Sequence, residues 1–236
     1  MGYIEDMVAD RRFGSVEDHR YLQSINKRLS NEPNNVDLLI EKGFLCVTIF
    51  EDDGEAEPAL RKAIELDPNN IDALFWLASM HFYCIGDMSS AEKFLIRALK
   101  VDPNRADCRY LLASVLFSIE GFSSGCLENL EKAVRLEPNW PNIRLWFVDL
   151  LIMSFRLLKA RSETLEGLRL FNEFKLPVDA DRKTFYIENF VTGRAYYTKY
   201  DFNVCLKRIH RRIWYFFLSA ILVVTTIFMV IWNIFS

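Results

Sequence analysis

The sequence contains few of the residues that build catalytic or metal sites. It has three histidines, His19, His81 and His210, and five cysteines that form no C-x-x-C pair. It contains no G-x-x-x-x-G-K-[ST] phosphate loop, no G-x-S-x-G nucleophile turn and no H-E-x-x-H zinc motif. An odd, scattered set of cysteines also argues against a disulfide framework. The sequence therefore predicts a protein that is not an enzyme and has no metal or cofactor.

Two short stretches come nearest to a ligand site. His81 and Cys84 lie three residues apart, a spacing that can place two metal ligands on one helical face. No second pair accompanies them, so a packed core histidine and cysteine are favoured. The acidic run at residues 51–55 lacks the alternating ligands of a calcium loop, and we expect a solvated turn before a helix.

The charge is distributed unevenly along the chain. The formal net charge is -3, but residues 207–236 carry four Lys or Arg and no acid. Residues 1–206 therefore hold 25 basic and 32 acidic side chains. A domain this acidic argues against a nucleic-acid partner. The apolar content of 51% also excludes a disordered polymer.

Four prolines recur at a fixed interval of 35 residues. They are Pro33, Pro68, Pro103 and Pro138. Between them the period holds for small and aliphatic residues, namely Ala56, Ala91 and Cys126, then Leu60, Leu95 and Leu130, then Ala63, Ala98 and Ala133. Spacings of four and three put these positions on one helical face. Upstream, Leu77-Ala78 and Leu112-Ala113 mark a first helix that ends near Gly86 or Gly121. Each unit is therefore predicted as helix, glycine turn, helix, proline turn.

This pattern resembles the tetratricopeptide repeat (TPR). The family's leucine and small-residue pair, turn glycine, small second-helix residues and closing proline match Leu77, Ala78, Gly86, Ala91, Ala98 and Pro103, and again Leu112, Ala113, Gly121, Cys126, Ala133 and Pro138. A third copy is matched by Gly43, Ala56, Ala63 and Pro68. The family period is 34 residues, whereas this chain has 35, so we expect an extended first helix. The resemblance implies a solenoid that binds proteins.

The repeats and the composition divide the chain into five segments. They are an N-terminal helical cap at residues 1–33 with helices near 3–12 and 16–30, three repeats at 34–138, degenerate fourth and fifth helix pairs at 139–206, a basic flank at 207–212, and an apolar segment at 213–235. In the fourth pair we expect helices at 143–158 and 162–174, with a turn around 156–161. A further helix is expected to begin near Asn203.

Residues 213–235 form a run of 23 residues without a charge. A helix of this length would measure about 35 Å and could cross a hydrocarbon core of about 30 Å. Interfacial aromatic and basic residues are found at its ends, namely Lys207, Arg208, Arg211, Arg212, Trp214, Tyr215 and Trp232. A buried core helix or an amphipathic surface helix is the alternative. The run predicts an integral, single-pass protein, tail-anchored in a lipid bilayer, with its N-terminal domain cytoplasmic.

The first helices of the repeats are predicted to form an inner wall that binds a partner. The candidate groove residues are Asp72 and Asp107 with the flanking Ile40, Phe75, Tyr110, Leu145, Phe82 and Phe117. An acidic stripe between aromatic columns suits a peptide with apolar side chains and a basic residue. The alternative is that these aromatic columns are helix-helix core. The sequence leaves both interpretations open.

The sequence thus predicts an all-α fold, a right-handed α-solenoid of stacked antiparallel helix pairs followed by one C-terminal transmembrane helix. Its predicted function is that of a non-catalytic, membrane-anchored adaptor or scaffold for a protein or peptide partner. The alternative is an assembly factor or chaperone-like subunit of a membrane complex, with the transmembrane helix taking part in contacts. Chaperone-binding members of the family use a clamp of Lys, Asn and Arg, which this chain replaces with Ile40, Phe44, Phe75, Ser79, Tyr110 and Ser114.

Overall fold

The computed structural model describes residues 16–50, 52–138, 140–173 and 199–235. For residues 16, 17, 141, 142, 171–173, 199–202, 222 and 224–235 it describes the backbone only. Within these ranges every regular element is a helix and none is a strand, which confirms the all-α prediction. The chain forms two compact units, unit 1 at residues 1–129 and unit 2 at residues 130–236.

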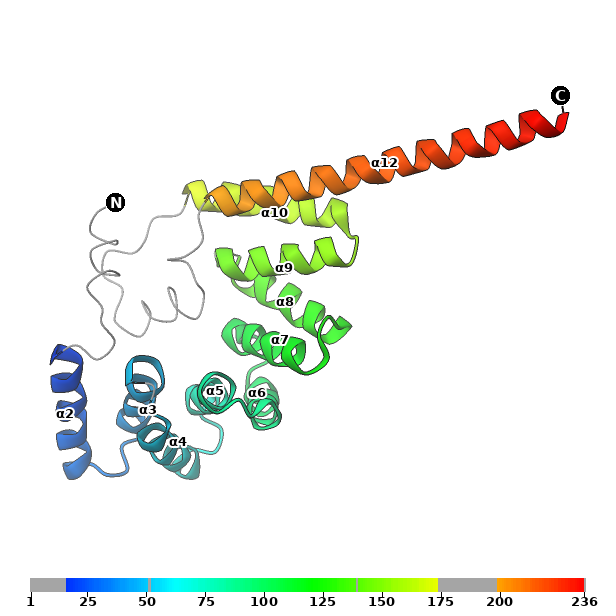
Figure 1. Ribbon diagram of the computed structural model, residues 1–236. Coiled ribbons are helices and arrows are strands. Elements are labelled where there is room, and N and C mark those ends of the chain that lie inside the picture. The colour runs from blue at the N-terminus through cyan, green and yellow to red at the C-terminus, as the bar shows by residue number, and fades with distance from the viewer. Residues whose placement is uncertain (1–15, 51, 139, 174–198, 236) are drawn as a thin grey trace. The chain divides into compact units, whose positions relative to one another are not determined.

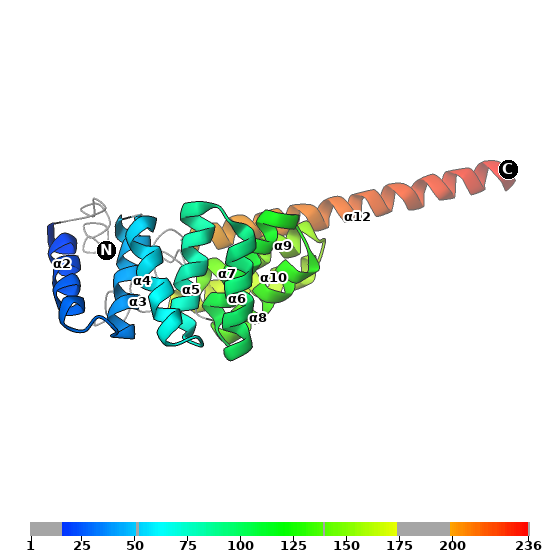
Figure 2. The same cartoon turned by 90° about the horizontal axis from the view of Figure 1, so that it is seen from below.

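Unit 1 is built from helix α2 (Val16–Asn31) and a series of antiparallel helix pairs (Figures 1 and 2). The pairs are α3 (Val36–Leu45) with α4 (Asp53–Leu66), α5 (Ile71–Met80) with α6 (Met88–Val101), and α7 (Ala106–Glu120) with α8 (Ser124–Leu136), whose last turns belong to unit 2. Each pair packs against the next, because α4 contacts α5 and α6 contacts α7. The small residues of the period are fully buried, including Ala56, Ala91 and Ala98. Stacked hairpins therefore bury faces that a single hairpin would expose.

Proline turns connect the pairs, and aspartates hold these turns. The carboxylate Oδ1 of Asp67 accepts a hydrogen bond of 3.2 Å from the backbone amide of Asn69. Asp102 repeats this contact with Asn104 at 2.8 Å. Such Asx turns satisfy a backbone donor just past the end of the preceding helix. The Asp-Pro-Asn punctuation of the sequence is thus a local hydrogen-bonding device.

The extra residue of the 35-residue period is absorbed differently in different repeats. In the first two pairs the first helix ends in a π-helical turn, η1 (Cys46–Phe50) and η2 (His81–Ile85), and these turns lie one period apart. A π turn accommodates one inserted residue without breaking the helix. In the third pair α7 continues as an α-helix to Glu120. Gly86 and Gly121 then leave the helices at positive φ, 77° and 71°, as glycine permits.

Unit 2 contains α9 (Pro141–Met153), α10 (Leu157–Glu173) and α12 (Lys199–Phe235). The turn between α9 and α10 lies at residues 154–156, earlier than the predicted 156–161. Phe155 makes this turn at a φ of 58° and is the one non-glycine residue with positive φ in the described ranges. The turn falls about one period after Gly121, so the repeat is retained even though its glycine is lost.

The first part of α12 packs on α9 and α10, and the helix then extends beyond α10 (Figure 1). Cys205 and Ile209 are buried in this contact. Further along, the side chains from Trp214 to Leu218 are all exposed. Residues 191–198, which belong to the predicted fifth pair, lie outside the described ranges, as does the predicted helix at 3–12.

The predicted membrane insertion is not supported. Among the described residues, no helix is both long enough and apolar enough to cross a membrane. The prediction of an integral, single-pass membrane protein is therefore wrong, and the tail anchor and the bilayer contact of residues 213–235 are without support. Helix α12 begins at Lys199 and includes the charged residues up to Arg212, and it packs on α9 and α10 through Cys205 and Ile209. The alternative of an intramembrane subunit is likewise without support.

Candidate protein-interaction surface

The first helices of the repeats in unit 1 differ in how the residue just before each helix caps it. The Asn35 side chain accepts a hydrogen bond of 3.2 Å from the amide of Leu38 and thereby caps α3. Asn70 caps α5 in the same way, through the amide of Ala73 at 3.1 Å. One period later the position is Arg105, whose side chain has no acceptor atom, and α7 has no side-chain cap.

Arg105 instead joins two successive repeats. Its Nη2 lies 3.0 Å from Asp72 Oδ1 on α5 and 2.6 Å from Asp107 Oδ2 on α7. Its Nε donates a second bond to Asp107, 3.0 Å from Oδ1. Asp107 thus receives the two-pronged contact that guanidinium groups form with carboxylates. We call Asp72, Arg105 and Asp107 the Arg105 cluster.

The electrostatics of the Arg105 cluster keep the arginine charged. Partial burial lowers the pKa of Arg105, but the hydrogen bond to Asp107 and the charges of Asp107 and Asp72 outweigh burial, and the pKa is raised overall. The Asp107 side chain is only 8% exposed and also accepts from the amide of Cys108 at 2.7 Å. These partners compensate the negative charge of the buried Asp107 carboxylate, whereas removal of Arg105 would leave that charge uncompensated.

The structure separates the eight predicted groove residues into core and surface. Buried are Ile40 on α3, Phe75 on α5, Asp107 on α7 and, in unit 2, Leu145 on α9; partly accessible are Asp72, Phe82, Tyr110 and Phe117. Phe75 is 1% exposed, and its ring centroid lies 5.0 Å from that of Trp76. For Ile40 and Phe75 the packing interpretation therefore applies. The accessible residues remain candidates for partner contact.

Arg105 was not among the predicted site residues. The signal was available, because the position holds Asn35 and Asn70 in the preceding repeats and then changes to arginine. Here an arginine replaces the asparagine that caps the helix in the preceding repeats, and two aspartates lie at equivalent positions of successive repeats. This combination indicates an ion pair between repeats. Arg105 lies in the turn before α7, outside the helix positions from which the groove residues were predicted.

His81 and Cys84 do not share an environment. His81 is buried, with no hydrogen bond to either ring nitrogen, while Cys84 is exposed. The imidazole lies 3.7 Å from Asp87 through Nδ1, and its ring is 5.5 Å from that of Phe94. Within the described residues no group of His, Cys, Asp and Glu is arranged to hold a metal ion.

Three of the buried cysteines, Cys46, Cys108 and Cys126, lack the features of reactive thiols. Burial raises the pKa of Cys46 to about 11 and that of Cys126 to about 11. Burial, followed by the charge of Asp107, raises the pKa of Cys108 still further. A thiol is nucleophilic only as a thiolate, so these three side chains are packing residues at neutral pH.

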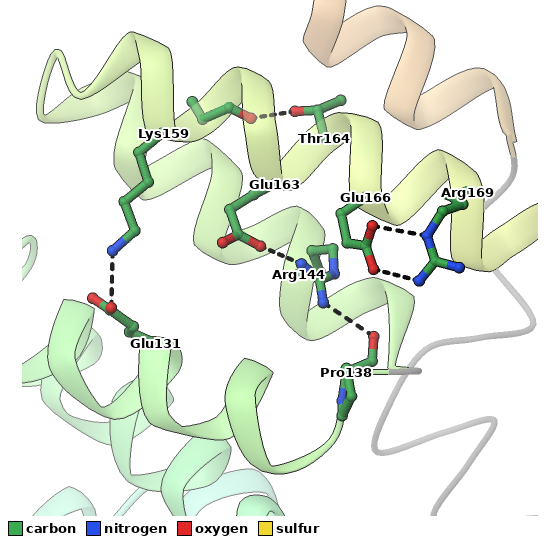
Figure 3. Close-up of polar contacts among 9 residues, drawn as sticks. Glu131, Pro138, Arg144, Lys159, Glu163, Thr164, Glu166 and Arg169 are labelled. Carbon is green, nitrogen blue, oxygen red and sulfur yellow. Dashed lines mark hydrogen bonds and ion pairs between the residues drawn. The ribbon is translucent and has the colours of Figure 1, made fainter.

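A buried arginine organises the first two helices of unit 2 (Figure 3). Arg144 on α9 is 5% exposed, pairs through Nη1 with Glu163 on α10, and donates through Nη2 to the carbonyl of Pro138 at 3.2 Å. Burial lowers the pKa of Arg144, and the charge of Glu163 acts in the opposite direction. One period earlier, Arg109 makes the matching bond to the Pro103 carbonyl at 2.8 Å. The hydrogen bond from this arginine to the proline carbonyl is thus a structural element of the repeat.

The residues predicted at a membrane interface are placed on α12. Arg208 pairs with Asp149 on α9 at 2.6 Å, and Arg212 donates to the Ile152 carbonyl at 2.7 Å. Exposed are Lys207, Arg211, Trp214 and Tyr215. The side chain of Trp232 lies outside the described part. Two of the four predicted basic residues therefore attach α12 to α9.

Comparison with known proteins agrees with this repeat geometry. Residues 52–115 match the tetratricopeptide repeat family. Sequence comparison with curated proteins gave no match.

Solved structures similar to this chain share its fold. PilF of Pseudomonas aeruginosa is 20% identical with a TM-score of 0.56, and the match covers 86% of this chain and 94% of that protein. YrrB, described as a TPR protein with an unusual peptide-binding site, is 20% identical with a TM-score of 0.56 over 80% of this chain and 91% of its own. MamA of Desulfovibrio magneticus RS-1, from residue 41 to its end, is 18% identical with a TM-score of 0.56, covering 67% of this chain and 88% of that one. Together with the repeat geometry, these matches identify residues 52–115 as tetratricopeptide repeats within a TPR-like helical solenoid.

Proposed function

We propose that this chain is a non-catalytic scaffold that binds a protein or peptide partner along the first-helix wall of unit 1. The wall consists of the partly accessible residues Asp72, Phe82, Tyr110 and Phe117. The observation that carries the proposal is that the Arg105 cluster and half-buried aromatic side chains lie on the same first helices. Asp72 and Asp107 are in the first turns of α5 and α7, Tyr110 follows one turn later, and Phe82 and Phe117 lie about 15 Å further along. A charged cluster at one end and accessible rings along the helices offer both orientation and apolar contact, the two requirements of a peptide site.

The charge of unit 1 indicates the kind of partner. Residues 1–129 contain 13 Lys or Arg and 22 Asp or Glu. A surface of this sign favours peptides that carry basic residues, and it accelerates their association. The rings of Phe82, Tyr110 and Phe117 would receive apolar side chains of the same peptide. We therefore expect a partner segment that combines a basic residue with apolar or aromatic residues.

The comparisons support protein binding as the general role. TPR proteins mediate protein-protein interaction, and YrrB, which shares this fold, has a peptide-binding site. Its identity of 20% carries no residue assignment to this chain. The wall proposed here therefore rests on the burial and contacts of this chain's own residues.

The proposal is tested by selecting peptides from a random library on the full chain and measuring their affinity for variants. Tyr110→Ala and Phe117→Ala should each weaken binding by about tenfold or more, because aromatic anchors dominate such interfaces. Ile96→Ala is the matched control, since Ile96 is 40% exposed on the second helix α6. Selected peptides that bind both wall variants as tightly as the wild-type chain would refute the wall as the binding site.

A further inference from the structure

The turns that join the two helices of the second and third pairs of unit 1, and α9 with α10 in unit 2, expose apolar side chains. In unit 1 these are Tyr83 and Ile85 in the second pair and Ile119 and Phe122 in the third. We call these residues rim 1, together with one acid from the turn region of each of the three pairs, Asp53, Asp87 and Glu120. The two hairpins are adjacent, because α6 packs against α7. Rim 1 is therefore an apolar edge shared by successive repeats. It adjoins the proposed peptide wall, because the ring centroids of Tyr83 and Phe82 lie 4.7 Å apart.

The same edge of unit 2 is more exposed. Met153, Phe155 and Leu158 at the α9–α10 turn are 50%, 75% and 81% exposed. We call these three residues, with Arg156 and Arg161, rim 2. The guanidinium of Arg212 lies 5.6 Å from the centroid of the Phe155 ring, within the range of a cation–π contact.

The backbone at rim 2 indicates that the exposed ring is retained at a cost. Phe155 has a φ of 58°, and the turn glycines Gly86 and Gly121 also have positive φ. A left-handed conformation costs a non-glycine residue about 1–2 kcal/mol. Strain of this kind concentrates at functional positions. A bulky apolar residue both strained and exposed is explained by a surface that covers it.

The two rims carry opposite charge. Residues 46–56, 81–91 and 116–126 contain no Lys or Arg, and they hold six acids, namely Glu51, Asp52, Asp53, Glu55, Asp87 and Glu120. Residues 151–161 contain Arg156, Lys159 and Arg161 and no acid. Over the whole units, 13 bases and 22 acids in residues 1–129 stand against 16 bases and 10 acids in residues 130–236. The partner that fits rim 1 is therefore an apolar surface ringed by arginines, and rim 2 has this composition.

We propose that rim 1 of one copy of this chain docks on rim 2 of a second copy. The apolar residues of the two rims would cover each other, while Asp53 and Glu120 would face Arg156 and Arg161. Such a contact joins two different surfaces, so it is heterologous, and repetition produces a chain of copies or a closed ring. Exposed apolar patches surrounded by polar residues commonly mark protein interfaces.

The test is a charge exchange on the full chain, followed by sedimentation velocity over a range of concentrations. Asp53→Lys with Glu120→Lys makes rim 1 basic, and Arg156→Glu with Arg161→Glu makes rim 2 acidic. Each double variant alone should weaken self-association by about tenfold or more, because like charges then oppose each other. An equimolar mixture of the two variants should restore association. High salt should weaken wild-type association, since the screening length falls from about 10 Å at 0.1 M to about 3 Å at 1 M.

A control separates the rims from net charge and from the exposed end of α12. Glu65→Lys with Glu92→Lys changes the net charge equally on the second helices α4 and α6 and should leave association unchanged. Phe155→Ser with Leu158→Ser, which leaves the charges intact, should weaken it. Wild-type chain that is monomeric at all concentrations would overturn the proposal and leave the rims to another protein. Association that persists in both charge variants, or is not restored by mixing, would overturn it equally.

Discussion

Units 1 and 2 share one repeat pattern but have different residues at equivalent positions of the repeat. In unit 1 the turn residues are Gly86 and Gly121, and the arginine that bonds a proline carbonyl, Arg109, is partly accessible. In unit 2 the turn residue is Phe155, and the matching arginine, Arg144, is buried and paired. The sign of the charge also reverses between the units. The period fixes where a residue is placed, whereas its environment decides whether that residue is a minor contact or a structural requirement.

The largest difference between the units should appear at the two period-matched arginines. Arg144→Ala leaves Glu163 without its buried partner and should lower the free energy of unfolding by about 3–5 kcal/mol. Arg109→Ala removes a partly exposed hydrogen bond and should cost about 0.5–1.5 kcal/mol. Urea unfolding followed by circular dichroism measures both. Equal losses at the two positions would contradict the distinction between the units.

A replacement of both partners sharpens this test. Arg144→Met combined with Glu163→Leu removes the charges together, and such exchanges are often neutral or stabilising. The double variant should therefore recover most of the stability lost in Arg144→Ala. If it does not, the loss arises from packing and not from an uncompensated charge.

The turn residues should respond in opposite directions. No atom lies within 4 Å of the position that a Cβ would take at Gly86, so Gly86→Ala meets backbone strain alone, about 1–2 kcal/mol at a φ of 77°. Phe155→Asn places a residue that tolerates positive φ and should raise the free energy of unfolding by up to about 1 kcal/mol. Thermal or urea unfolding gives both signs. A destabilised Phe155→Asn chain would mean that the ring contributes more through its contacts than it costs in strain.

The smallest expected effect concerns the acid stability of unit 2. The hydrogen bond from Lys159, at 2.8 Å, lowers the pKa of Glu131 below its ordinary 4.5 (Figure 3). A carboxylate with a lowered folded-state pKa stabilises the fold above its unfolded pKa, and this contribution is lost as the pH falls through the folded pKa. Glu131→Gln should therefore reduce stability at neutral pH, by about 1 kcal/mol or less, and not in strong acid.

The Glu131 prediction has a partner variant. Lys159→Met removes the group that lowers the pKa of Glu131 most, while Arg135 still lowers it. This variant should produce a pH dependence of the same sign as Glu131→Gln but of smaller size. The two variants compared by urea unfolding at neutral and acidic pH test the assignment. A loss that is the same at both pH values would show that the carboxylate does not act through its charge.

The repeat could be predicted from the sequence because its determinants are local. Pro68 and Pro103 end the helices, Asp67 and Asp102 hold the turns, and Ala91 and Ala98 permit close approach. The position of the extra residue could not be predicted, since one inserted residue is equally compatible with a longer helix and with a π turn. The structure uses both, η1 and η2 in the first pairs and a continuous α7 in the third.

The candidate site was predicted less completely. Columns counted by the period included Ile40 and Phe75, which are core residues, because a period gives the side of a helix but not the depth of burial. Arg105 was missed since it acts from a turn toward a neighbouring repeat, and its partners lie 33 and 2 residues away in the chain. The apolar run at residues 213–235 predicted a membrane span, whereas no helix in the described part of the chain is long and apolar enough to cross a membrane.

The π turns lie at the ends of the first helices, between the segments that pack in the stack and the solvent-exposed hairpin turns. A residue inserted at the tip of a helix rotates every later side chain of that helix, while the buried stripe nearer its start is unaffected. Substitutions and single-residue insertions at the tips can thus alter the outer edge of the array without disturbing its interior. Neighbouring hairpins can therefore share the same packed interior and still differ in the conformation of their turns. New contact surfaces can arise on such a scaffold one hairpin at a time.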